Sequence, residues 1–154
     1  MPQLVKGGKH TFGWSIISSS GRIMIPAEAR EEYNLKTGDK LIIISGSKTS
    51  GGFSIVEIEK LRSSSLSNIL ENNSHFNILK TTKGEPVKKN QRVFCWAEIE
   101  EDGSFIIPIN TLALFGASPG NRLLAIRGSG LGVGFAVKGP IIQEAEKHKE
   151  LEIF

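Results

Sequence analysis

Two stretches of the chain, each 45 residues long, decide its fold. Residues 12–56 read FGWSIISSSGRIMIPAEAREEYNLKTGDKLIIISGSKTSGGFSIV, and residues 94–138 read FCWAEIEEDGSFIIPINTLALFGASPGNRLLAIRGSGLGVGFAVK. They align without a gap, and more than a quarter of the aligned positions are identical, where background composition gives about three matches. The identities include both tryptophans, one proline per stretch and several glycines. Repetition at a fixed offset predicts two tandem copies of one small unit.

The first copy is expected to begin with a hairpin and a short helix. Residues 14–16 and 23–25 flank the turn dipeptide Ser20-Gly21, and this pattern predicts two strands joined by a tight turn. Pro26 follows at once, and proline is favoured at the first helical position because its missing N–H would be unsatisfied there anyway. The helix is expected to end at Asn34, since asparagine readily takes the left-handed conformation found beyond a helix.

The remainder of each copy is expected to be a turn and two strands. Gly38 and Gly120 occupy the third position of a turn, where glycine supplies a positive φ. The runs that follow, 41–44 and 123–126, are apolar at every position, as expected of strands covered on both faces. A last strand completes the order β-β-α-β-β. A unit of this size is too small to bury a stable core alone, so the two copies must pack on each other or on a partner chain.

The run GRIMIPAEAR at residues 21–30, followed by NLKTGDKL at residues 34–41, resembles the AbrB/MazE/SpoVT family of swapped-hairpin DNA-binding domains. The second copy, with GSFIIP at residues 103–108 and PGNRL at residues 119–123, resembles the same scaffold. In that family two units interleave their hairpins into one β-barrel. The resemblance implies a mostly β fold with short helices, in which the two units form a swapped-hairpin, double-psi-like barrel as a pseudo-dimer within one chain, as in double-copy relatives such as the MraZ proteins. The alternative is a homodimer in which first units pair with first units.

The resemblance also implies a duplex DNA partner and the residues that contact it. The family's DNA contacts come mainly from arginines in the loop after the first strand and at the end of the short helix, and Arg22 and Arg30 match these positions. Lys36 and Lys40, in the following turn and strand, complete the expected DNA-binding set. The alternative interpretations are a solvated turn arginine at Arg22 and, at Arg30, a surface ion pair with a nearby glutamate, which contributes little to stability.

The second copy lacks these arginines. Ser104 and Leu112 stand where the first copy has its two arginines, and a group of acidic residues near them would repel phosphates. The acidic residues are Glu98, Glu100, Glu101 and Asp102. Symmetric reading of a palindrome is therefore not expected, unless two chains assemble with their first copies together.

Charge is unevenly distributed along the chain, whose 154 residues carry a net charge of +3. Residues 1–59 hold 7 basic and 6 acidic side chains, residues 60–92 hold 7 and 2, and residues 93–154 hold 5 and 8. The basic segment would attract a polyanion, but its serine, asparagine, glycine and proline content favours a solvated linker. The expected divisions are a first unit at 10–59, a basic helix and linker at 60–92, a second unit at 93–139 and a C-terminal helix at 140–154.

The chain is expected to be neither an enzyme nor a metal or cofactor protein. His10, His75 and His148 are scattered, and no serine lies in a nucleophile-elbow context. The glycine-rich run 128–134 lacks the spacing of a nucleotide-binding loop and predicts a hairpin turn. The single cysteine, Cys95, has no partner for an internal disulfide, as expected in a reducing compartment. It is expected to pack in the core as a small apolar residue.

The sequence also predicts a cytoplasmic protein without membrane contact. The longest aliphatic run is residues 41–44, far short of the roughly 18 apolar residues that cross a bilayer. The first ten residues lack the apolar core of a secretion signal.

Three functional hypotheses follow from these observations. The leading one is a DNA-binding transcriptional regulator of the AbrB-like type that contacts duplex DNA through the arginines of its first unit. The alternative is a protein-interaction or oligomerisation module, as a homodimer or higher homo-oligomer, that has lost DNA binding in its second unit. The third is an antitoxin whose C-terminal segment wraps a toxin partner, although residues 143–154 are short and mixed in charge.

Overall fold

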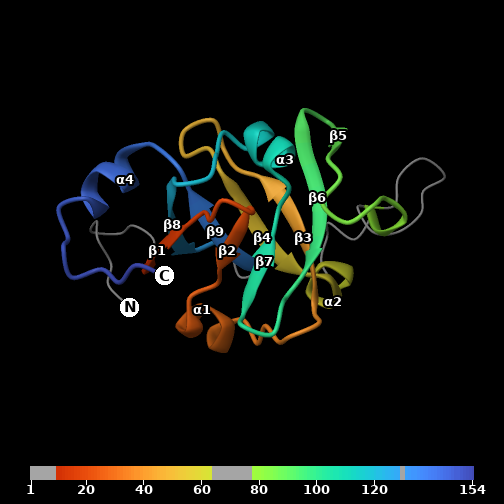
Figure 1. Cartoon of the computed structure of the whole chain (residues 1–154), viewed down its shortest axis with the longest axis horizontal. Coiled ribbons are helices and arrows are strands. Elements are labelled where there is room, and N and C mark those ends of the chain that lie inside the picture. Colours follow the sequence, from red (N-terminus) through yellow and green to blue (C-terminus); the bar gives the residue numbers. More distant parts are fainter. Residues whose placement is uncertain (1–9, 64–77, 129–130) are drawn as a thin grey trace.

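The computed structural model describes residues 10–63, 78–128 and 131–154, and this part of the chain is mostly β with short helices (Figure 1). The first half contains β1 (Thr11–Ile16), β2 (Arg22–Met24), α1 (Ala27–Glu32), β3 (Lys40–Ser45) and β4 (Phe53–Glu57). The second half contains β6 (Arg92–Glu98), β7 (Ser104–Ile106), α3 (Ile109–Leu114), β8 (Arg122–Arg127) and β9 (Gly132–Ala136). The remaining elements are α2 (Ile58–Arg62), the 3-10 helix η2 (Ile78–Lys80), β5 (Val87–Lys89) and α4 (Pro140–Ala145).

The short helix α1 lies where the sequence predicts it, although Pro26 is its N-cap and not its first helical residue, and α3 is the matching helix of the second half. α1 follows Pro26 and α3 follows Pro108. Beyond each helix the chain turns through a left-handed residue, Asn34 with φ 52° and Gly116 with φ 77°. Within the described ranges, no helix is long and apolar enough to cross a membrane.

The strands of each half pair largely with strands of the other half. β1 pairs with β8 and β6 pairs with β3, while β2 and β7 form a separate two-stranded sheet in which Ile23 lies opposite Phe105. The prediction of a hairpin around Ser20-Gly21 is therefore wrong for its strands. The turn itself forms, and in it the Ser18 N–H donates to the Arg22 carbonyl at 3.0 Å. The physical reason is burial, because five of the six residues of β1 are buried and an isolated hairpin would leave them exposed.

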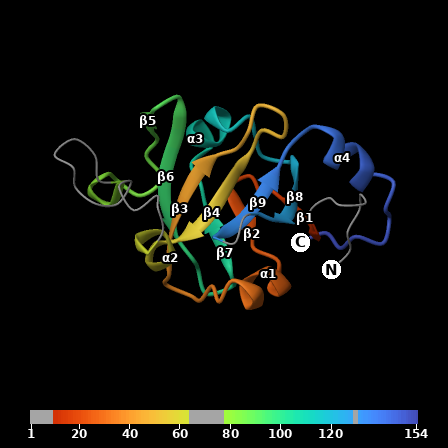
Figure 2. The same ribbon diagram turned by 180° about the vertical axis from the view of Figure 1, so that it is seen from behind.

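Reciprocal backbone hydrogen bonds join the two halves. The Ile17 N–H donates to the Asn121 carbonyl, and the Ile99 N–H donates to the Asp39 carbonyl, both at 3.0 Å. The seven-stranded antiparallel sheet has the order β1-β8-β9-β4-β3-β6-β5, so β4 and β9 lie side by side near its centre (Figure 2). Across the described residues this sheet is open, with β1 and β5 at its edges. The expected closed swapped-hairpin barrel is therefore not confirmed.

The C-terminal helix expected over 140–154 is wrong for most of its length. α4 ends at Ala145, and the last residues run in parallel beside β1. The Trp14 N–H donates to the Glu152 carbonyl at 2.8 Å, and the Phe154 N–H donates to the Trp14 carbonyl at 2.6 Å. These bonds satisfy backbone groups at the edge of β1, which would otherwise be unpaired, and they require an extended chain rather than a helix.

The basic segment 60–92 is only partly a linker. α2 ends at Arg62, so the helix expected at the start of this segment stops early, and residues 64–77 lie outside the described residues. Farther on, β5 pairs with β6 in antiparallel register, with Lys88 opposite Val93. The last part of the segment therefore belongs to the sheet and not to a linker.

Four phenylalanines form the centre of the core between the two halves. The ring centroid of Phe53 lies 5.3 Å from those of Phe115 and Phe135 and 6.1 Å from that of Phe105. Cys95 is fully buried in the same cluster, and burial raises the pKa of its thiol to about 12. Its predicted place in the core is confirmed.

Phe53→Ala should lower the free energy of unfolding by about 3–5 kcal/mol, because it opens a cavity among three other rings. Leu114→Ala on α3 is the control, since this leucine is 42% exposed and its loss should change stability by only about 0.5 kcal/mol. Urea unfolding followed by tryptophan fluorescence measures both. Equal losses in the two variants would contradict the placement of the core at this cluster.

Candidate nucleic-acid interface

The four residues predicted to contact DNA lie on successive elements of the first half. Arg22 is in β2, Arg30 is in α1, Lys36 is in the turn after α1, and Lys40 begins β3. The two lysines are exposed, whereas the two arginines are partly buried. The arginines therefore contact the protein itself, and the lysines remain at the surface.

Arg22 reaches across the β2–β7 pair to the turn before β7. Its Nη1 donates to Ser104 Oγ at 2.8 Å and lies 3.2 Å from Asp102 Oδ2. The side chains of Arg22 and Asp102 are 42% and 48% exposed, so water screens this ion pair and it contributes little to stability. Hydrogen bonds from Ser104 lower the pKa of Asp102, and the Arg22 charge lowers it further. Arg22 is thus accessible to a phosphate, but it already has a charged partner.

Arg30 folds inward against the same turn. Its Nε donates to the Ile25 carbonyl at 3.1 Å. A Cβ atom built on Gly103 would lie 2.5 Å from Arg30 Cζ, so the guanidinium packs directly on the glycine backbone. The nearby glutamate Glu32 forms its ion pair with Arg127, and the Arg127 Nε donates to Glu32 Oε2 at 3.0 Å. Arg30 therefore holds α1 against the turn before β7.

Lys40 and the turn that contains Lys36 lie against the second half. Lys40 is opposite Glu98 in the register of β3 with β6, and its Nζ lies 5.7 Å from the centroid of the Trp96 ring. In the turn that contains Lys36, the Thr37 hydroxyl donates to the Glu100 backbone carbonyl at 3.4 Å. The Glu98 carboxylate reduces the positive potential beside Lys40, as the sequence predicts for the acidic second half.

The contact of Arg22 with Asp102 could not be read from the sequence. The two residues are 80 positions apart, and only the pairing of β2 with β7 brings them together. Sequence reasoning assigned the cations of β5 and β6 to a solvated linker, whereas the structure presents them on a hairpin. The sequence signal for these cations is the charge of residues 60–92, which hold 7 basic and 2 acidic side chains in a composition typical of loops.

Comparison with known proteins bears on the same part of the chain. Residues 15–49 match a family model described as antidote-toxin recognition MazE, bacterial antitoxin. The matched segment contains all four of the predicted DNA-contacting residues. The solution structure of PHS018 from Pyrococcus horikoshii is similar at 21% sequence identity, covering 82% of this chain and 95% of that one, with a TM-score of 0.38. No curated protein matches the chain.

Gly103→Ala should destabilise the protein more than Gly38→Ala does. The two glycines have φ of +87° and +86°, so both variants carry the same backbone cost of about 1–2 kcal/mol. A methyl group at position 38 meets nothing within 4 Å, whereas one at position 103 displaces the Arg30 guanidinium. Urea unfolding measures the difference. Equal free energies of unfolding would show that Arg30 does not hold α1 through this contact.

Proposed function

We propose that the chain is a cytoplasmic, non-catalytic DNA-binding regulator of the AbrB-like type, which contacts duplex DNA mainly with its first half. The observation that carries this proposal is the match of residues 15–49 to the MazE model, because that segment holds the four predicted cations. Arg22, Lys36 and Lys40 are assigned as phosphate contacts, since their side chains reach solvent. Arg30 acts indirectly, as the residue that positions α1.

The proposal includes two tandem units that form a pseudo-dimer with exchanged strands. Support comes from the aligned sequences, from the pairing of β1 with β8 and of β6 with β3, and from the reciprocal bonds of Ile17 and Ile99. In this arrangement Arg22 and Ser104 hold equivalent positions on the paired strands β2 and β7. A symmetric dimer of first units would place two arginines there, whereas this chain places one arginine beside a serine and an aspartate.

This asymmetry defines how such a regulator would meet DNA. Asp102 competes with phosphate for Arg22, because both are anions that would bind the same guanidinium. Phosphate contacts position a protein on the duplex without reading its sequence. We therefore expect weak, salt-sensitive binding through one half and no preference for palindromes.

A protein partner, as for an antitoxin, is the second candidate. On α3 the side chains of Ile109 and Leu114 are 48% and 42% exposed. The equivalent positions of α1 are Ala27 and Glu32, so these exposed apolar side chains belong to the second half alone. They are available to a protein partner, such as the toxin named in the description of the matched family model.

Asp102→Asn should raise the affinity for duplex DNA, because it releases Arg22 and removes a repulsive charge. Glu101→Gln is the matched control, since it removes the same charge from the neighbouring exposed residue. Fluorescence anisotropy with one generic duplex measures both variants. A larger gain for Asp102→Asn supports direct competition for Arg22, and equal gains contradict it.

Arg22→Ala should weaken duplex binding and reduce the slope of log affinity against log salt concentration by about one, if the residue contacts one phosphate. The same titration on the unaltered chain tests the proposed function itself. An affinity that does not rise as salt is lowered would refute DNA binding.

An intramolecular pseudo-dimer should have the mass of one chain in solution. Light scattering after gel filtration measures this mass across a range of protein concentrations. A mass of two chains at every concentration would instead favour a dimer of first units.

A further inference from the structure

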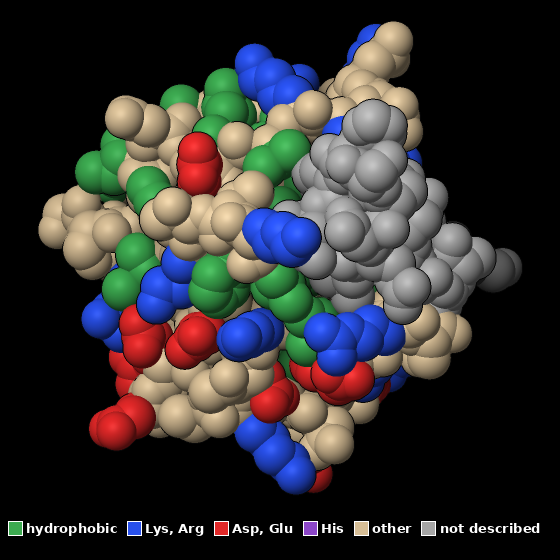
Figure 3. Space-filling view, turned by 90° about the vertical axis from the view of Figure 1, so that its right-hand side faces the viewer, with side chains coloured by type: hydrophobic (Ala, Val, Ile, Leu, Met, Phe, Trp, Pro, Cys, Tyr) green, Lys and Arg blue, Asp and Glu red, His purple; other side chains and the backbone are tan. Residues whose placement is uncertain are grey.

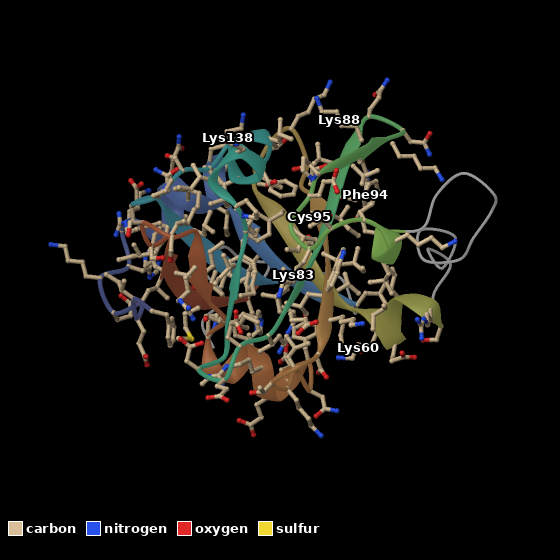
Figure 4. The ribbon with its side chains drawn as sticks, turned by 45° about the vertical axis from the view of Figure 1, so that its right-hand side comes forward. Lys60, Lys83, Lys88, Phe94, Cys95 and Lys138 are labelled. Carbon is tan, nitrogen blue, oxygen red and sulfur yellow. The ribbon has the colours of Figure 1, made fainter. Side chains whose placement is uncertain are left out.

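The hairpin formed by β5 and β6 projects beyond the end of β3, its neighbour in the sheet. The pair of residues next to its turn is Lys89 opposite Arg92. The ladder between β6 and β3 ends at Phe94, so the hairpin continues about two residues beyond the sheet, or roughly 7 Å at the rise of a strand. In Figure 4 the labelled Lys88 lies at this outer end of the ribbon.

The turn of the hairpin holds two exposed amide side chains at positive φ. Asn90 and Gln91 form a two-residue loop with φ of 51° and 64°, as in a type I′ turn, where glycine is preferred at the second position. A glutamine there carries a conformational cost that glycine would avoid. Such a cost, retained at an exposed turn, points to a use for the side chain.

Two cations of the hairpin have no carboxylate partner among the described residues. Lys88 and Arg92 are exposed, and across residues 10–63, 78–128 and 131–154 no carboxylate forms an ion pair with either. Figure 3 shows Lys and Arg side chains at the top of this side of the molecule, while most Asp and Glu side chains lie in its lower half. Lys88 and Arg92 are therefore available to a polyanion.

We propose that this hairpin is a DNA-binding ribbon, in which Lys88 and Arg92 contact phosphates of a duplex and Asn90 and Gln91 enter the major groove. A two-stranded β-ribbon fits a major groove, which is about 12 Å wide and about 8.5 Å deep, and the projecting part of the hairpin matches that depth. Asparagine and glutamine amides form paired hydrogen bonds with the edge of adenine. The cations would position the ribbon and the amides would select the sequence.

A protein or membrane partner fits the hairpin less well. Among the described residues, the large apolar side chains that are exposed all lie elsewhere. They are Ile16, Ile109, Leu114 and Ile153. Insertion into a bilayer surface requires apolar side chains, and protein interfaces are depleted in lysine and rich in aromatic residues. Cations around an amide turn therefore favour nucleic acid.

This inference rests on the proposed function for its ligand, duplex DNA, but it uses different residues. The family-matched segment ends at residue 49, whereas the hairpin spans residues 87–98. The two surfaces can therefore be tested separately by substitution.

The double variant Lys88→Glu with Arg92→Glu should weaken binding to a generic duplex and reduce the salt slope by at least about two, one for each lost phosphate contact. The control is Lys147→Glu with Lys149→Glu, which changes the net charge equally. These lysines follow α4, at the opposite end of the molecule from β5 (Figure 1). A similar loss in both double variants would show a general charge effect and overturn the proposal.

Arg22→Ala, titrated beside these variants, separates this proposal from the proposed function. A loss only in the hairpin variant supports the ribbon and contradicts the Arg22 face, and a loss only in Arg22→Ala does the reverse. Losses in both support both surfaces, and no duplex binding by the unaltered chain overturns both. Equal affinity for polyglutamate or for phosphatidylserine vesicles would overturn the assignment to nucleic acid.

The double variant Asn90→Gly with Gln91→Gly tests sequence reading. Glycine suits the positive φ of both positions, so this variant should unfold at an equal or higher urea concentration. Selection from random duplexes should enrich a common sequence with the unaltered chain and none with the variant, while the salt slope stays the same. Enrichment of one sequence by both, or by neither, overturns the base-reading role.

Discussion

The exchange of strands between the two halves is the constraint on which the rest of the structure depends. β1 and β6 each find their partner in the opposite half, and the amides of Ile17 and Ile99 repeat the same exchange at the ends of those strands. The aromatic core also joins the two halves, because Phe53 lies on β4 of the first half and the rings around it belong to the second half. Neither half alone contains the sheet partners of both β1 and β8 or of both β3 and β6, and the ring of Phe53 packs against rings of the other half. The described parts of both halves therefore stabilise one another.

This constraint also decides the electrostatics of the first-half face. Pairing of β2 with β7 places Arg22 beside Asp102 and Ser104, and it places Arg30 on the backbone of Gly103. Cations that form a basic motif in the sequence thus lie against the acidic half of the same chain. In contrast, the cations of the β5–β6 hairpin lie beyond the end of the β3–β6 ladder. A surface outside the family-matched segment therefore presents the less neutralised charge.

Local elements were predictable because local chemistry decides them. A proline starts each of the two short helices, and left-handed residues such as Asn34 and Gly116 lie just beyond their ends. Pairing partners were less predictable, since a turn dipeptide such as Ser20-Gly21 indicates a reversal but not which strand lies alongside. The C-terminal residues were also not predictable from local composition, which favours a helix. They are extended because their backbone groups form hydrogen bonds with the edge of β1.

The sequence by itself determined the order of the elements, the duplicated pattern of tryptophan, proline and glycine, and the positions of the four cations in the first half. These features depend on neighbours within a few residues. Only the tertiary structure decided that Arg22 is paired, that Arg30 supports α1, and that part of the basic segment is a projecting hairpin. The physical reason is that charge and backbone pairing act through space. Asp102, 80 residues away in the chain, lies 3.2 Å from the Arg22 guanidinium.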